Sequence, residues 1–336
     1  MATVGTERRA RARRGAGTRV LLAALAAATL AAGCTTSEGP GDDGRGSPRQ
    51  SSPAPRETGP AEEADSPPVL AVKIDNARAA RPHTGLQDAD VVYVEQVEGG
   101  MSRLMALYAT RLPESVGPVR SARESDLELL RQFDRPVLAF SGAQGKLLPL
   151  IDRAPLEAVT PETEAGAWAR GTGRPAPHNL YLRPGRLMDE PPGAAALTTG
   201  FRYGRPPAAG APEDELTVRY PAARTTFTWS DDRDRWLVSM DGTPAVTTEG
   251  ERLAPATVVV QYVTVRRSGF QDFLGNNTPY TETVDSGEAT VLRGGRAYEA
   301  RWERPAAEDG TSFTTAAGER LNFARGQVWV VYAKAP

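Results

Sequence analysis

The sequence predicts an α+β protein, in which a layered α/β N-terminal domain is followed by a smaller, mostly antiparallel β domain. Between Val69 and Phe140, runs of strand length flank one segment with helical spacing, and strand, helix, strand is typical of a layered α/β unit. Beyond residue 214, nearly every apolar run is rich in β-branched and aromatic residues, which favour strands. Residues 184–214 are rich in Pro, Gly and Ala, as expected of a domain boundary.

Three extended runs open the N-terminal domain. Val69–Ile74 reads as a buried strand that ends at Asp75-Asn76, and Val91–Val97 reads as a second strand. Gly99-Gly100 then ends the second strand before Arg103–Ala109, which we expect to be a third strand and a hairpin partner of the second.

A helix is expected over Ser121–Phe133. Ser121 is a suitable N-cap and Glu124 follows three residues later, which is the spacing of a capping box. Apolar residues then recur at helical spacing. Pro136 ends the helix, and Val137–Phe140 returns as a strand.

The C-terminal part is predicted to be almost entirely β. Thr225–Trp229 and Arg235–Met240 flank a polar turn at residues 231–234, which predicts a hairpin. The further strands expected are Thr257–Arg266, Ala289–Leu292, Arg296–Trp302, Ser312–Thr315 and Gln327–Tyr332.

The N-terminus has the layout of a lipoprotein signal peptide. Residues 1–33 combine an Arg-rich start with an uncharged run, Val20–Ala32, and small residues lead to Cys34, the sole cysteine of the chain. We expect acyl chains, palmitate among them, on Cys34, with plain secretion as the alternative. Residues 34–67 are polar and rich in Gly, Ser and Pro, which predicts a disordered tether. The folded domains are then expected at residues 68–205 and 214–336.

The charge of the chain excludes some partners. The formal net charge is -2. The leader holds six Arg and one Glu, a net of +5, which leaves -7 on the exported part. An acidic exported protein has no electrostatic reason to bind nucleic acid. The signal peptide and the lipid on Cys34 predict that the protein is anchored at the extracytoplasmic face of the bacterial cell membrane.

Six local strings in the N-terminal part resemble one protein family. They are Ala71–Asn76, Arg81–Leu86, Ala89–Tyr93, Val97–Arg103, Gly117–Arg123 and Ala176–Tyr181. In order and spacing they look like the YerB-like bacterial lipoproteins, whose exported part is a pair of domains of unknown function. The resemblance covers roughly residues 68–335. It implies a membrane-anchored lipoprotein with two parts, and it implies no activity.

The loop Gly117–Arg123 is the first candidate for a binding site. Arg120 and Arg123 flank the expected helix start, where unsatisfied N–H groups attract anions. With Arg103, they would bind a phosphate- or carboxylate-bearing envelope component such as a glycan or a lipid-linked ligand. The alternative is that these arginines are held by a carboxylate elsewhere in the fold, such as Glu98.

Other polar residues lie in loops. Asp75 and Asn76 follow a buried strand, at the end where ligands bind in α/β layers, although Asp-Asn is also common in turns. His178 and Asn179 lie in a Pro-containing loop. His178 is suited to be a general base or a donor to an anion, or else a residue that fixes its loop.

Three functions therefore remain open. The first is an anion-binding lipoprotein, and the second is an envelope hydrolase or transferase with His178 as base and Asp75 or Glu98 as its partner. The third is a non-catalytic scaffold for an envelope protein. Whether the protein is an enzyme is left open, and an enzyme requires His178 and an acid to meet near the arginines. The sequence contains no HExxH, GxSxG or cysteine-based metal motif, so no metal site and no cofactor is predicted.

Overall fold

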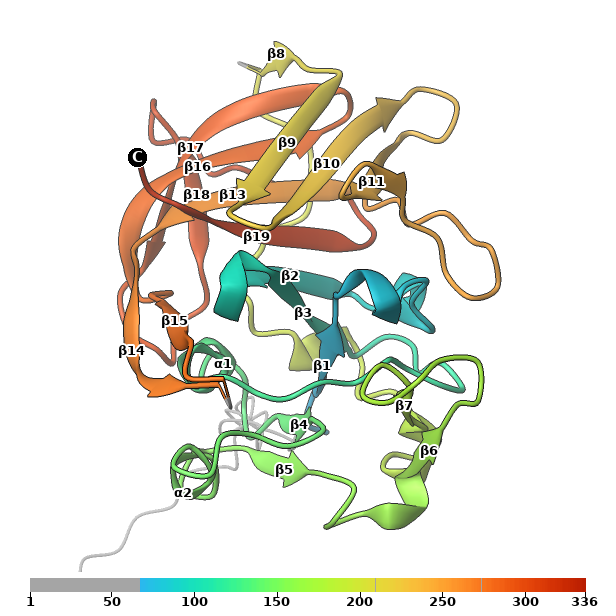
Figure 1. Cartoon of the computed structure of the whole chain (residues 1–336). Coiled ribbons are helices and arrows are strands. Elements are labelled where there is room, and N and C mark those ends of the chain that lie inside the picture. The colour runs from blue at the N-terminus through green and yellow to red at the C-terminus, as the bar shows by residue number, and fades with distance from the viewer. Residues whose placement is uncertain (1–66, 209, 273) are drawn as a thin grey trace, which may run out of the picture. The chain divides into compact units, whose positions relative to one another are not determined.

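The computed structural model describes residues 67–208, 210–272 and 274–336 (Figure 1). The predicted signal peptide, the lipidated Cys34 and most of the predicted tether lie outside the described residues. Within these ranges, none of the helices combines the length and the apolar character needed to cross a bilayer.

One eleven-stranded sheet dominates the described residues. Its strands follow the order β18-β17-β16-β13-β19-β2-β3-β1-β4-β5, with β8 beside β17. The N-terminal half supplies β1 (Leu70–Asp75), β2 (Val91–Gln96), β3 (Ser102–Tyr108), β4 (Val137–Ala139) and β5 (Glu157–Val159). The C-terminal half supplies β8 (Ala211–Pro212), β13 (Thr257–Val263), β16 (Asp285–Arg293), β17 (Arg296–Arg304), β18 (Ser312–Thr315) and β19 (Val328–Lys334).

Smaller elements complete the fold. A four-stranded sheet contains β9 (Glu215–Tyr220), β10 (Ala223–Ser230), β11 (Arg235–Met240) and β12 (Thr243–Pro244). Two strand pairs are formed by β6 (Trp168–Arg170) with β7 (Leu180–Leu182) and by β14 (Val265–Gln271) with β15 (Asn277–Thr281). The α-helices are α1 (Glu124–Leu130) and α2 (Leu148–Ile151). Short 3-10 helices occupy Arg78–Ala80, Leu86–Asp88, Glu98–Gly100, Ala165–Ala167, Pro184–Arg186 and Ala194–Ala196.

The prediction of an α+β protein with a layered α/β N-terminal domain is wrong. Within the described residues the fold is mostly β, and its α-helices have only seven and four residues. The expected strand–helix–strand order is present, and β2 pairs antiparallel with β3 as the predicted hairpin, but the neighbour of β2 on its other side is β19. Sequence periodicity reports the type of each element and not which distant strand lies beside it.

The start of the helix also differs from the prediction. α1 begins at Glu124, with Arg123 and not Ser121 as the N-cap. The carboxylate of Asp126 accepts the backbone N–H of Arg123 at 2.7 Å, so the helix closes its own first turn. The expected capping box of Ser121 and Glu124 is therefore not formed.

The core lies on both faces of the large sheet. β19 runs parallel to β13 on one side and to β2 on the other, with Val331 opposite Val260 and Val94. All three of these side chains are buried, and each such burial contributes about 1.5–3 kcal/mol. One sheet thus contains strands from both predicted domains, and the predicted division at residues 205–214 stays a prediction.

The carboxyl end of β1 is where the loops of the N-terminal half meet. The N–H of Asp75 donates to Pro118 O at 2.9 Å, and the N–H of Arg120 donates to Lys73 O at 2.8 Å. The N–H of Val119 donates to Leu180 O at 2.7 Å, which brings the loop before β7 to the same end. In Figure 1 the β14–β15 hairpin lies beside α1, and contacts between β15 and α1 hold it there.

Candidate functional site

Three charged residues stand in one row across three strands. Asp75 on β1 lies opposite Arg103 on β3, and Arg103 lies opposite Glu95 on β2. Residues directly opposite one another project to the same face of a sheet. All three side chains are buried, so the row needs compensating partners.

Lys73 provides the partner for Glu95. The Lys73 Nζ contacts the Glu95 carboxylate and lies 2.7 Å from Asp126 Oδ1, and the Lys73 side chain has no exposed surface. Burial raises the pKa of Glu95 to about 7, because burial and the nearby Asp126 charge outweigh the opposing effect of Lys73. This network ties β1 to β2 and α1, and we assign it a structural role.

Asp75 and His178 meet at the end of β1. Asp75 Oδ2 lies 2.8 Å from His178 Nδ1 and 3.5 Å from Arg120 Nε. Asp75 Oδ1 also accepts the backbone N–H of Ala77 at 3.1 Å. A neutral His178 donates Nδ1–H to Asp75, which leaves Nε2 without a hydrogen-bond partner among the described residues and the ring partly exposed.

His83 supports Asp75 from the main chain. Its Nε2 lies 2.9 Å from the backbone oxygen of Asp75, so Nε2 carries the proton and donates. Burial, helped by the nearby charge of Arg81, lowers the pKa of His83 to about 4, although the hydrogen bond to Asp75 opposes this. His83 is therefore neutral at pH 7 and fixes the backbone where Asp75 leaves the strand.

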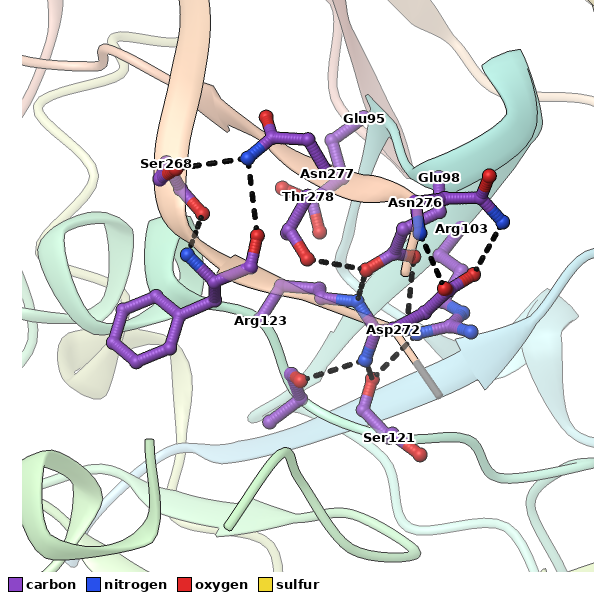
Figure 2. A network of polar contacts seen from close by, with 12 residues as sticks. Glu95, Glu98, Arg103, Ser121, Arg123, Ser268, Asp272, Asn276, Asn277 and Thr278 are labelled. Atoms are coloured by element: carbon purple, nitrogen blue, oxygen red, sulfur yellow. Dashed lines mark hydrogen bonds and ion pairs between the residues drawn. The ribbon is translucent and has the colours of Figure 1, made fainter. Parts of the chain in front are cut away.

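Arg123 forms an ion pair with Glu98, as Figure 2 shows. Arg123 Nε lies 2.6 Å from Glu98 Oε1, and Nη2 donates to Oε2 at 2.9 Å. Thr278 on β15 donates to Glu98 Oε1 at 2.6 Å. Burial raises the pKa of Glu98, but the hydrogen bond and charge of Arg123 outweigh it and the net pKa is lowered. The Arg123–Glu98 pair joins the start of α1 to the β2–β3 turn, and Thr278 attaches the β14–β15 hairpin to the same turn.

Arg103 lacks such a partner. Its Nη1 donates to the backbone oxygen of Ser121 at 3.0 Å, an acceptor that it shares with Arg123 (Figure 2). No carboxylate among the described residues forms an ion pair with Arg103, although the residue is only 7% exposed. Burial and the neighbouring charge of Arg123 lower the pKa of Arg103 to about 10.

The two predicted asparagines are held by hydrogen bonds within the protein. Asn76 donates to Ser102 Oγ at 3.0 Å and accepts Arg81 Nε at 3.0 Å. Asn179 accepts Arg170 Nη1 at 2.8 Å and donates to Gly171 O at 3.0 Å. These contacts fix the chain near Asp75 and His178, and a ligand contact by either asparagine stays a prediction.

Sequence reasoning missed the network around Lys73. The available signal was a lone cation inside the apolar run Val69–Ile74, since a lysine in a buried strand requires a carboxylate partner. Within the described ranges, no three His, Asp or Glu side chains gather in an arrangement that could hold a metal ion.

Two segments of the chain match one protein family. Residues 57–196 match the N-terminal domain of the DUF3048 family of proteins of unknown function, and residues 216–330 match its C-terminal domain. The chain belongs to this family. The resemblance to YerB-like proteins is thereby confirmed.

Comparisons of sequence and of structure both find a YerB protein of Bacillus subtilis similar to this DUF3048 protein. "Putative lipoprotein YerB" of strain 168 is 45% identical over 65 residues, which are 19% of this chain and 20% of that protein. The match thus spans one fifth of the relative's length. The crystal structure of the YerB protein aligns with a TM-score of 0.65 at 20% identity, over 79% of this chain and 90% of that chain. At this identity the likeness establishes the fold alone.

Proposed function

We propose that the protein is a lipoprotein anchored through Cys34 to the extracytoplasmic face of the bacterial cell membrane, and that it binds an anionic envelope component. The leader before Cys34 supports the anchor. The description of its Bacillus relative as a putative lipoprotein supports it as well. The ligand would be a phosphate- or carboxylate-bearing glycan or a lipid-linked molecule.

Arg103 is the observation that carries the binding proposal. Lys73 and Arg123 are both held by carboxylates, whereas the buried Arg103 has a single neutral hydrogen-bond acceptor. The charges of Glu98 and Asp75 act on Arg103 without a direct ion pair. Burying a cation without a counter-charge is unfavourable. A ligand anion beside Arg103 would supply that charge.

Arg120 adds a second cation to the same place. It is half-buried, and its Nε lies 3.5 Å from Asp75 Oδ2. That separation is longer than a hydrogen bond, so the Arg120 N–H groups remain available to a ligand. Arg103 and Arg120 also influence each other electrostatically, since the charge of Arg120 helps to lower the pKa of Arg103.

An enzyme is the second candidate, and the contact between Asp75 and His178 favours it. Asp75 Oδ2 lies 2.8 Å from His178 Nδ1, which orients the ring and makes Nε2 the free base of the neutral side chain. The protein would then be a hydrolase or transferase that acts on a glycan or phosphodiester, with Arg120 stabilising the developing charge. We assign the role of carboxylate partner of His178 to Asp75, because Glu98 is held by Arg123 and Thr278.

Ligand-dependent thermal stability tests the binding proposal. The purified protein would be unfolded in the presence of lipid-linked phosphates, teichoic-type phosphodiesters and peptidoglycan fragments. We expect a saturable rise in melting temperature that Arg103→Gln abolishes and that Arg111→Gln, at an exposed arginine, retains. No rise with any ligand, or a rise that Arg103→Gln keeps, would overturn the proposal in favour of a protein partner.

Product analysis separates the enzyme from the binding protein. If the bound ligand is converted, His178→Ala should abolish product formation while the thermal shift persists. An unchanged ligand after prolonged incubation with wild-type protein would leave binding as the function.

A further inference from the structure

The loop after β4 lies against the segment that carries Arg120. The N–H of Ser141 donates to Arg120 O at 3.0 Å, and the N–H of Ala122 donates to Gly142 O at 3.0 Å. Because β1 and β4 are parallel, the loop after β4 and Asp75 lie at the same edge of the sheet. The loop therefore borders the proposed anion site.

This loop presents a run of free backbone donors. From Gly142 to Lys146, none of the five consecutive N–H groups has an acceptor among the described residues, and regular bonding resumes where Leu147 N donates to Gln144 O at 2.8 Å. A Cβ atom added at Gly142 or Gly145 would meet nothing within 4 Å, so open space borders the backbone there. Consecutive unbonded N–H groups are the donors from which anion-binding concavities are built.

Lys146 adds a cation to the loop. It is exposed, and no carboxylate among the described residues pairs with it. Lysine is rare in this protein, where Lys73 and Lys334 are the others. Lys73 is bound in the buried network and Lys334 lies at the end of β19, so Lys146 is the lysine next to the Arg120 segment.

The number of donors indicates the class of ligand. A carboxylate has two oxygens, which one guanidinium fork can satisfy. Here the donors come from Lys146, from a stretch of backbone, and from the N–H groups that Arg103 and Arg120 keep beyond their contacts with Ser121 O and Asp75. An anion with many unesterified oxygens and more than one negative charge matches this set better.

We propose that the loop Gly142–Lys146 is part of the anion site and that the ligand presents a pyrophosphate group. This inference rests on the proposed binding function and names its ligand chemistry. The Arg103 and Arg120 side chains would contact one phosphoryl group, and the loop backbone and Lys146 would contact the other. A free pyrophosphate and a lipid-linked pyrophosphate share this chemistry.

Calorimetric titration of the purified full-length protein tests the loop. The probes are inorganic pyrophosphate, farnesyl pyrophosphate, inorganic phosphate and succinate. We expect pyrophosphate to bind more tightly than phosphate or succinate. Lys146→Gln should weaken pyrophosphate binding about tenfold, the loss of one charged contact worth about 1.4 kcal/mol. Ala143→Pro, which removes one loop N–H, should weaken it similarly, and Lys334→Gln should leave it unchanged.

The outcomes separate this inference from the proposed function. If Arg103→Gln loses binding while Lys146→Gln and Ala143→Pro bind pyrophosphate like wild type, the loop inference is overturned and the proposed function stands. If Arg103→Gln also binds normally, both are overturned. Succinate binding as tightly as pyrophosphate contradicts the ligand class. Farnesyl pyrophosphate binding more tightly than inorganic pyrophosphate identifies a lipid-linked source, and equal affinities identify a free one.

Discussion

The Nζ atom of Lys73 lies 2.7 Å from Oδ1 of Asp126, and neither side chain has exposed surface. Glu95 contacts the same Nζ, so one buried cation serves two buried carboxylates. Such a network contributes little beyond its desolvation cost while it is intact, but losing one member leaves the others uncompensated.

Replacing Lys73 should therefore be severe. Lys73→Met leaves Glu95 and Asp126 buried without their cation, and we expect the free energy of unfolding to fall by about 3–5 kcal/mol. Urea denaturation measures this loss. Lys334→Met at an exposed position is the matched control and should stay within about 0.5 kcal/mol of wild type. Equal effects of the two substitutions would show that the network is not structural.

His83 predicts a pH dependence of stability. Its pKa is about 4 in the folded protein against an ordinary histidine value of 6.5, chiefly because of burial, with Arg81 and Arg174 lowering it and Asp75 opposing them. Between these values the unfolded chain binds a proton that the folded protein does not. The stabilisation is therefore complete above pH 6.5 and is lost as pH falls towards 4, by up to about 3 kcal/mol.

The His83→Gln variant isolates this contribution, because a glutamine amide can still donate to the Asp75 carbonyl. The difference in unfolding free energy between wild type and the variant should rise as pH increases from 4 to 6.5. A difference that does not change with pH would contradict the assignment of a neutral, buried His83.

The pair of Arg123 and Glu98 should show strong coupling. Arg123→Met leaves the Glu98 carboxylate buried, and we expect a loss of about 3 kcal/mol in unfolding free energy. Arg123→Met/Glu98→Met replaces both partners with apolar groups and should be more stable than Arg123→Met alone. Chemical denaturation of the three proteins gives the coupling. A double variant that loses the sum of both single effects would show that the residues act independently.

Gly100 should tolerate no side chain. Its φ is +71°, and an added Cβ would lie 2.5 Å from Pro221 Cβ. We expect Gly100→Ala to lower the free energy of unfolding by about 1–3 kcal/mol, from backbone strain and the clash together. Gly145→Ala, where a Cβ meets open space, is the control and should change stability little. Thermal denaturation of both variants checks this, and a stable Gly100→Ala protein would contradict the close contact with Pro221.

Local elements were predictable because their signals are local. Val91–Val97 corresponds to β2, and the predicted hairpin of Thr225–Trp229 with Arg235–Met240 forms as β10 and β11. Alternating burial along a strand follows directly from the pleat. The fold class was not predictable in this way, because it depends on β19 pairing with β2, strands far apart in the chain.

The site was predictable only in part for the same reason. The sequence marks Asp75 and His178 separately as polar residues in loops, but nothing local in it indicates that their side chains meet, since the contact spans 103 positions. Arg103, Arg120 and Arg123 were equivalent cations in the sequence. The structure distinguishes them, because Glu98 forms an ion pair with Arg123 alone. Sequence periodicity does not reveal the fold of the turn that brings Glu98 to Arg123.

The position of β19 has a consequence for how the chain acquires its structure. Every other strand of the large sheet precedes β19 in the sequence, yet β19 lies at the centre, between β13 and β2. Until residues 328–334 arrive, β13 and β2 each expose an open edge that can recruit a strand from another molecule. Closing the sheet also requires very long loops to be ordered late, which favours slow folding. A chain cut short before Val328 should therefore aggregate rather than form half of the structure, and the growing protein depends on protection of these edges until its last strand is available.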